Sequence, residues 1–175
     1  NAHVACVKES LYRLSYSQIE EVNSLSEIQH DIIRETLRYK LGTFHGFGPF
    51  HMGRLEITSI ADVPYGTGLG SSSSFAVGLL HALHTLSNSF CDVRQLAHQA
   101  CYVEIDLCKK PIGRQDQYAA AIGGLSFMTF RKGNVNVEPV FVNPDTRMQI
   151  QDNLLLLWTG KTRDASVPLK IQSQE

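Results

Sequence analysis

A run of glycine and serine between two apolar segments carries the clearest chemical signal in the sequence. It reads DVPYGTGLGSSSSF over residues 62–75, and Gly66, Gly68 and Gly70 stand at alternate positions. Glycines at this spacing leave the backbone open to a ligand and allow positive φ angles that turn successive N–H groups the same way. The serines after them favour the first turn of a helix, where unpaired N–H groups attract anions. The run predicts a phosphate site, with serine hydroxyls available to a magnesium ion.

A linker, a P-loop and a Rossmann fingerprint each fit this run less well than a phosphate site of another type. A flexible linker would have polar flanks, whereas residues 54–60 and 75–83 have the apolar content of packed elements. A P-loop needs a lysine after its last glycine. None follows Gly70, and the later GKT triplet at 160–162 lacks the glycine five positions before it. A Rossmann fingerprint needs a third glycine where Ser71 stands.

Two acidic residues downstream could supply the other chemistry of phosphoryl transfer. That reaction needs magnesium held by oxygen atoms and a group that orients or deprotonates an alcohol. Glu104 lies one step off the apolar stripe of a predicted helix, and Asp116 follows a Pro/Gly turn at the start of a short one. One carboxylate can serve each task. Solvated surface charge is the alternative for either acid, and the residues alone favour that alternative.

The loop closely resembles that of a known family. Residues 64–74, PYGTGLGSSSS, are similar to the Pro-x-x-x-Gly-Leu-Gly-Ser-Ser phosphate loop of the GHMP kinases, named for galacto-, homoserine, mevalonate and phosphomevalonate kinases. In that family a glutamate binds magnesium, and an aspartate near the acceptor hydroxyl follows it at the spacing that separates Glu104 from Asp116. The resemblance implies an α+β fold of the GHMP kinase N-terminal, ribosomal protein S5 domain 2-like type, in which a mixed sheet packs against helices.

The same resemblance implies a set of site residues. The phosphates of ATP would be bound by Pro64, Gly66, Thr67, Gly68, Leu69, Gly70, Ser71, Ser72 and Ser73. Mg²⁺ would be held by Ser72 and Glu104, and Asp116 would be the catalytic residue. Arg114 and Gln117 would contact the substrate.

The segment GRQDQYAAAIGG at residues 113–124 is similar to members that phosphorylate sugars at the anomeric hydroxyl, with heptose 7-phosphate kinases nearest and fucokinases next. The implied function is ATP-dependent phosphorylation of a sugar substrate, with heptose 7-phosphate to heptose 1,7-bisphosphate first and a fucokinase- or galactokinase-like reaction second. A non-catalytic nucleotide or sugar-phosphate binding module stays open as an alternative of another class, because a fold alone does not define a function.

Two parts of the family pattern have no counterpart here: an opening Arg-x-Pro-x-Arg and Gly-Gly-Gly-Thr-Asp segment, and a C-terminal domain with a third glycine motif. We therefore expect residues 1–175 to be one N-terminal ATP-binding domain that is incomplete at both ends. On this interpretation the chain alone lacks kinase activity, needs the missing C-terminal domain, and tends to self-associate, homo-oligomers included.

Periodicity and caps indicate the elements that must position these residues. Alternation and apolar runs predict strands at residues 3–7, 11–16, 55–60, 125–130 and 135–140, and a central buried strand at 154–158. Helical spacing predicts helices from a capping box at residues 24–27 to about 39, from the serines to 86, from an Asp92 cap to before Pro111, and near 116–122. The pattern is that of one α+β domain.

Composition restricts the remaining classes of function. The chain has 175 residues, 43% of them hydrophobic and 19% charged, which is ordinary for a globular protein. A net charge of −1 without a basic cluster argues against nucleic acid as a partner. No apolar run predicts a membrane span or a signal peptide, so we expect a cytoplasmic protein. The four cysteines predict reduced thiols, and the seven histidines lack the ligand spacing of a zinc site.

Overall fold

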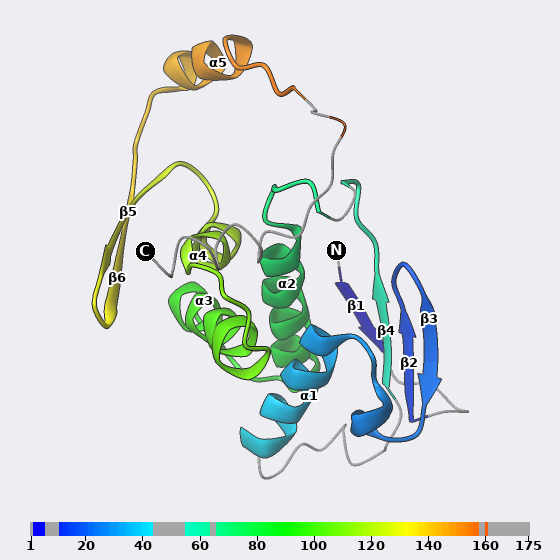
Figure 1. The fold of residues 1–175 in the computed structure, drawn as a ribbon. Helices are drawn as coiled ribbons and strands as arrows, with labels where there is room; N and C mark the ends of the chain where they lie inside the picture. The colour runs from blue at the N-terminus through cyan, green and yellow to red at the C-terminus, as the bar shows by residue number, and fades with distance from the viewer. Residues whose placement is uncertain (1, 6–10, 44–54, 64–65, 158–159, 161–175) are drawn as a thin grey trace.

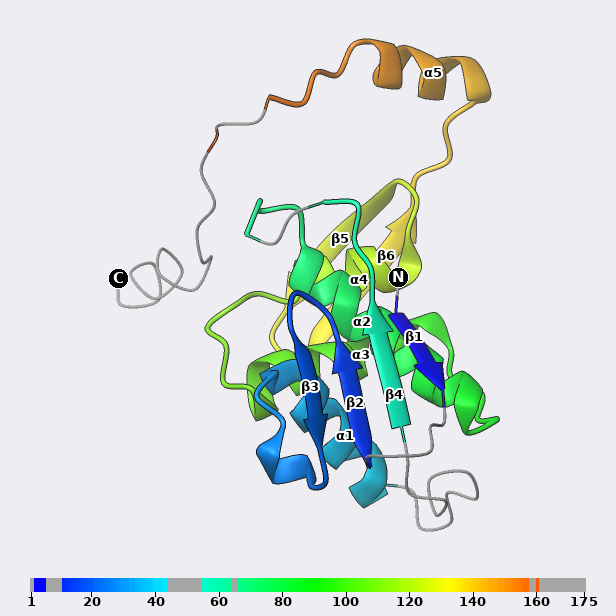
Figure 2. The ribbon, with the colours of Figure 1, turned by 90° about the vertical axis from the view of Figure 1, so that its right-hand side faces the viewer.

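The structure, a computed structural model, describes residues 2–5, 11–43, 55–63, 66–157 and 160. A four-stranded sheet forms one side of the molecule (Figure 2), with β1 (Ala2–Ala5), β2 (Tyr12–Ser15), β3 (Ile19–Val22) and β4 (Leu55–Ser59) in the order β1-β4-β2-β3. β4 runs parallel to β2, and the other neighbours are antiparallel. The predicted strands at the first three places are confirmed. β3 was not predicted, because IEEV gives little apolar alternation.

Two helices, α1 (Asp31–Thr43) and α2 (Ser71–Leu86), pack against one face of this sheet (Figure 1). α2 is buried on two sides, which explains its strongly apolar sequence. Leu79 and Leu83 join the sheet residues Leu14 and Ile57 in one core cluster. Ala76, Leu80 and other residues on the opposite side of α2 join a second cluster with the next helix. α2 therefore lies between two packed core clusters, which hold its N-terminal turn in place.

The helix after α2 changes its hydrogen-bonding pattern part of the way along. α3 (Val93–Cys101) begins at Asp92, whose side chain accepts from the N–H groups of Arg94 and Gln95, as the sequence predicts. The chain then continues as a π-helical segment, Tyr102–Leu107, in which the Cys108 N–H donates to the Val103 carbonyl five residues earlier. Such segments hold an extra residue in one turn and often occur at functional sites.

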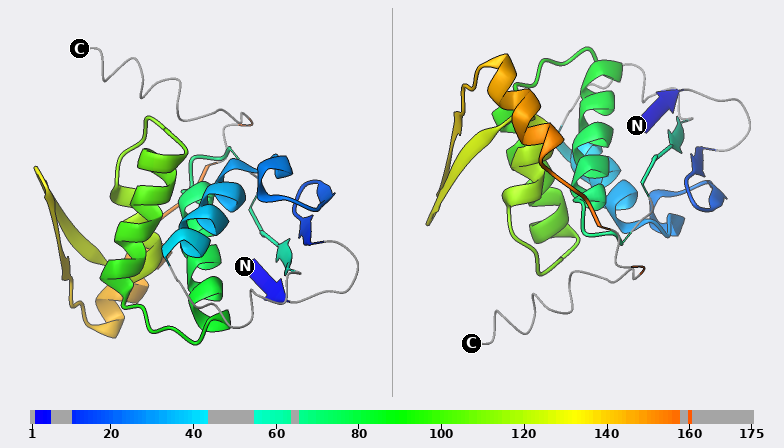
Figure 3. Two further views of the ribbon diagram at one scale, coloured as in Figure 1. Left: turned by 90° about the horizontal axis from the view of Figure 1, so that it is seen from below. Right: turned by 90° about the horizontal axis from the view of Figure 1, so that it is seen from above.

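A short helix and a hairpin follow α3 in the chain. α4 (Gln115–Ile122) packs beside α3, and β5 (Ser126–Arg131) pairs antiparallel with β6 (Asn134–Pro139). Figure 3 shows this hairpin on the far side of α3 and α4 from the four-stranded sheet. Val135 and Val137 pack there on Ala97 of α3. The short helix and the hairpin are confirmed predictions.

Two predictions about elements were wrong. The capping box at residues 24–27 exists, but it closes a 3₁₀ turn, Leu25–Glu27, because the next backbone at Ile28 is extended and the α-helix starts only at Asp31. Leu154–Leu157 is not a central buried strand. It lies beyond α5 (Pro144–Asp152), which was not predicted, and each of these four leucines is 73–82% exposed. An apolar run becomes a strand only where another strand can pair with it, and none in the described part of the chain does so here.

Some predictions lie outside the described residues. These include Pro64 of the loop and Trp158, whereas residues 66–73 of the loop are described. Among the described helices, none combines the length and apolar content needed to span a membrane.

Candidate active site

The glycine loop leads directly into the N-terminus of α2. Gly66, Gly68 and Gly70 have φ angles of 77°, 78° and 68°, in the left-handed region that favours glycine. Gly70 is the N-cap residue of α2, and its carbonyl accepts the first helical hydrogen bond, from the Ser74 N–H at 2.9 Å. The N–H groups of the first turn have no partner within a helix. The loop therefore has the positive-φ glycines and the helix start that the sequence predicted, and binding of a phosphate there stays a prediction.

Glu104, in the π-helical segment, is fully buried with a relative exposure of 0%. Its Oε1 accepts from the Ser72 hydroxyl at 2.5 Å, and its Oε2 accepts from the Ser73 hydroxyl at 2.7 Å. The amide Nε2 of Gln117 donates to the same Oε2 at 2.7 Å. A buried carboxylate is costly unless it is hydrogen-bonded or paired with a cation. Three neutral donors meet the first need.

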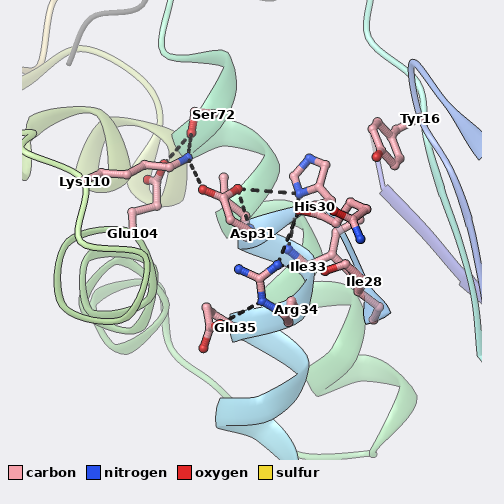
Figure 4. A network of polar contacts seen from close by, with 12 residues as sticks. Tyr16, Ile28, His30, Asp31, Ile33, Arg34, Glu35, Ser72, Glu104 and Lys110 are labelled. Carbon is pink, nitrogen blue, oxygen red and sulfur yellow. Dashed lines mark hydrogen bonds and ion pairs between the residues drawn. The ribbon is translucent and has the colours of Figure 1, made fainter. Parts of the chain in front are cut away.

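A lysine and an aspartate, Lys110 and Asp31, extend this cluster beyond Ser72 (Figure 4). Lys110 Nζ donates to Ser72 Oγ at 3.3 Å and forms an ion pair with Asp31 Oδ2 at 3.6 Å. Asp31 is the first residue of α1, so the cluster connects the N-termini of α1 and α2 with the end of the π-helical segment. Lys110 and Asp31 were not predicted as site residues, because nothing in their local sequence places them beside Ser72.

Asp116 lies beside Gly70, the last glycine of the loop. It is exposed in the first turn of α4, and its Cγ and Oδ2 would both lie 3.4 Å from a Cβ atom built on Gly70. The sequence predicted both the helical first turn and a place near the loop. The structure thus brings Ser72, Glu104 and Asp116 to one end of α2.

The two residues predicted to contact substrate have different environments. Arg114 is exposed and precedes α4. Gln117 is fully buried and donates to Glu104, so here it supports the carboxylate. Contact of either residue with a substrate stays a prediction. Within the loop, Thr67 Oγ1 is buried and makes no hydrogen bond in the described part of the chain.

A cavity of about 630 Å³ opens beside the start of α2. Its walls come from segments that are distant in sequence: the ends of β2 and β4, the start of α1, the start of α2, and Lys110. The lining residues are Tyr16, Ser17, His30, Asp31, Ile32, Ser59, Ile60, Ala61, Val63, Ser71, Ser72, Phe75 and Lys110. A volume of this size fits a drug-sized or nucleotide-sized ligand.

Aromatic rings form one wall of this cavity. The His30 ring meets Tyr16 edge-on, with centroids 4.8 Å apart, and lies 5.2 Å from the Phe75 ring. Burial, with a further contribution from Lys110, lowers the pKa of His30 below its ordinary value, although Asp31 acts in the other direction. The imidazole is therefore neutral near pH 7. Sequence reasoning missed this wall because its rings come from a strand, a helix lead-in and a helix.

The oxygen atoms of Ser72 and Glu104 fit a magnesium ion whose other ligands come from a bound molecule and from water. Ser72 Oγ and the Glu104 carboxylate are the oxygen donors that Mg²⁺ prefers. Among the described residues no group of three His, Cys, Asp or Glu side chains gathers as a metal site. A magnesium ion here would therefore need oxygen atoms from a phosphate and from water as its remaining ligands, which is how nucleotide-dependent enzymes commonly hold it.

The site thus consists of a glycine loop before the N-terminus of α2, with Glu104 and Asp116 on two sides of that turn. The sequence profile of the GHMP kinase N-terminal domain matches residues 31–124, more than half of the chain, and the chain belongs to this family. The matched range contains the loop, Glu104 and Asp116.

Several relatives are sugar kinases by name. The chain is 34% identical over 111 residues to D-glycero-alpha-D-manno-heptose 7-phosphate kinase of Campylobacter jejuni, covering 63% of this chain and 33% of that protein. It is 31% identical over 114 residues to L-fucokinase/L-fucose-1-P guanylyltransferase of Bacteroides fragilis, covering 63% of this chain and 12% of that protein. The chain thus spans a third or less of the length of the curated relatives it matches.

A solved structure confirms the fold. The crystal structure of a D-glycero-D-manno-heptose 1-phosphate kinase from Bacteroides thetaiotaomicron superposes with a TM-score of 0.71 at 22% identity, covering 81% of this chain and 48% of that one. The predicted α+β fold of the GHMP kinase N-terminal type is therefore correct.

Proposed function

We propose that this chain forms the nucleotide-binding part of an ATP-dependent kinase that phosphorylates a sugar or sugar phosphate at its anomeric hydroxyl. The observation that carries the proposal is the meeting of Ser72, Glu104 and Asp116 at the N-terminus of α2. Binding alone would need the loop but not two acids with different surroundings, one fully buried and one exposed. The names of the relatives support a sugar as the acceptor.

The loop and the first turn of α2 would bind the phosphates of ATP. Backbone N–H groups after Gly66 and the positive end of the helix would stabilise the negative charge. Ser72 and Glu104 would hold Mg²⁺, which when bound neutralises charge on the phosphate oxygens. Glu104 is suited to this task because its fixed hydrogen bonds keep it from turning away.

The aromatic cavity would accept the base and ribose of the nucleotide, since flat apolar rings suit a purine face. Asp116 would orient the acceptor hydroxyl and take its proton. The hydroxyl oxygen then forms a bond to the γ-phosphorus as the bond from that phosphorus to the β–γ bridging oxygen breaks, and ADP leaves. Asp116 is exposed, so it can give the proton to water afterwards.

A substitution of Asp116 tests the proposal in the full-length protein. Asp116→Asn removes the proton acceptor and should lower sugar-dependent ADP release about 100-fold or more, which is the usual contribution of a general base. ATP affinity measured by titration calorimetry should stay unchanged. Asp106→Asn is the matched control, because Asp106 is an exposed acid of the neighbouring segment. Equal turnover for wild type and Asp116→Asn would refute the assigned role.

The choice of sugar is tested by substrate competition. Heptose 7-phosphate, fucose and galactose should be offered to the wild-type protein in the same assay, and we expect heptose 7-phosphate to give the highest kcat/KM. Turnover of an unphosphorylated hexose alone would refute the heptose assignment and leave a sugar kinase. ATP binding without ADP release on any sugar would refute the kinase and favour a binding module.

A further inference from the structure

Lys110 occupies a place that the proposed reaction does not yet explain. Its side chain is one wall of the cavity, and its ammonium group contacts the hydroxyl of Ser72, the residue proposed to hold magnesium. Figure 4 shows the ammonium group between Ser72 and Asp31, with Glu104 behind Ser72. A lysine that served solubility alone would extend into water, whereas this side chain is three-quarters buried.

The backbone around Lys110 is shaped to place it there. After the π-helical segment, the Lys110 N–H donates to the Glu104 carbonyl at 3.0 Å. The Lys110 carbonyl accepts from the Ile112 N–H at 2.9 Å. The preceding residue, Lys109, has a φ of 56°, which is unfavourable for a residue with a side chain. This strained residue lies in the turn that directs Lys110 toward the start of α2.

The charges around Lys110 leave room for a negative ligand. Asp31 is its ion-pair partner, but the carboxylate is 44% exposed and the distance is 3.6 Å, so the pair contributes little to stability. The helical first turn beside Ser72 also attracts negative charge. A chain of phosphates at the first turn of α2, where the cavity meets Lys110, would bring more negative charge to the ammonium group than Asp31 does, and it can replace Asp31 as the partner.

We propose that Lys110 binds the phosphate chain of the nucleotide and that Asp31 holds the lysine in position while the cavity is free of nucleotide. This inference rests on the proposed function, because it takes the cavity as the nucleotide site. Lys110 then leaves the Ser72 hydroxyl to the magnesium ion and moves onto phosphate oxygens, where an ammonium group acts as a point charge. Asp31 competes with phosphate for Lys110 and so limits affinity.

Titration calorimetry on the full-length protein separates this role from a structural ion pair. Lys110→Gln should weaken ATP binding about 10-fold in EDTA and leave adenosine binding unchanged, since only ATP carries phosphates. Lys109→Gln is the matched control, being the exposed neighbour, and should change neither. Asp31→Asn should tighten ATP binding several-fold, and this gain should vanish in the double variant with Lys110→Gln.

The outcomes are distinguishable. Equal loss of ATP and adenosine binding in Lys110→Gln, or no loss of either, overturns the inference while leaving the kinase proposal intact. Inorganic tripolyphosphate serves as a second probe. If wild type binds no nucleotide but binds tripolyphosphate through Lys110, the proposed function fails and the phosphate-binding role of Lys110 stands. Thermal melts of each variant exclude loss of fold as the cause of any change.

Discussion

Replacing Gly70 by alanine tests whether the close approach of the loop to Asp116 matters for function. Gly70 has a φ of 68°, and a methyl group added there would lie 3.4 Å from Cγ and Oδ2 of Asp116. The left-handed conformation costs a residue with a side chain about 1–2 kcal/mol. A separation of 3.4 Å is ordinary contact, so crowding adds little. We expect Gly70→Ala to lower the free energy of unfolding by about 1–2 kcal/mol.

Gly133→Ala is the matched control for strain. Gly133 has a φ of 77° in the turn between β5 and β6, and no described atom lies within 4 Å of its built Cβ. Urea denaturation should give similar losses for the two variants. Turnover in the full-length protein should separate them, because only the methyl at Gly70 fills space beside Asp116. The methyl group need not move Asp116, but it occupies space beside the carboxylate that the acceptor would need, and a poorly placed acceptor can react about 100-fold more slowly. Equal turnover in the two variants would refute a functional role for this contact.

Two further predictions concern stability and its pH dependence. Burial opposes charge on Glu20, but hydrogen bonds from the Tyr16 hydroxyl and the N–H groups of Gln29 and His30 outweigh burial and lower the pKa of Glu20 below 4.5. These hydrogen bonds therefore stabilise the folded protein fully above pH 4.5, and their contribution is lost as pH falls through the folded-state pKa. In urea denaturation, Glu20→Gln should abolish this acid dependence. Burial lowers the pKa of Lys40 from 10.5 to about 8. Between these two pH values the unfolded chain binds more protons than the folded protein, so stability rises with pH across that window. Lys40→Met should therefore stabilise the protein at pH 7 by up to about 3 kcal/mol, and a gain that did not shrink by pH 10 would contradict this assignment.

Local structure was predicted correctly from the sequence where a few neighbouring residues decide it. Asp92 caps α3 because its own side chain reaches the next N–H groups. The loop glycines adopt positive φ angles, and Gly70 starts α2, because no other residue type takes that backbone readily. Asp116 lies in the first turn of α4, as the Pro/Gly turn before it in the sequence indicates.

The remainder depended on tertiary partners that local patterns do not contain. Leu154–Leu157 has the composition of a buried strand, but composition supplies no neighbouring strand. The capping box at residues 24–27 gave the right hydrogen bonds and the wrong helix, because the cap does not determine how long the turn continues. Lys110 and His30 reach the site only because the ends of different elements meet there.

The π-helical segment Tyr102–Leu107 makes the site sensitive to chain length more than to residue identity. Removing any one residue from it would restore ordinary α-helical bonding and rotate everything that follows by about 100°. Glu104, or the turn that carries Lys110, would then face another direction while the core positions of α3 stayed in place. We therefore expect a single-codon deletion in this segment to separate Glu104 from Lys110 without removing either side chain.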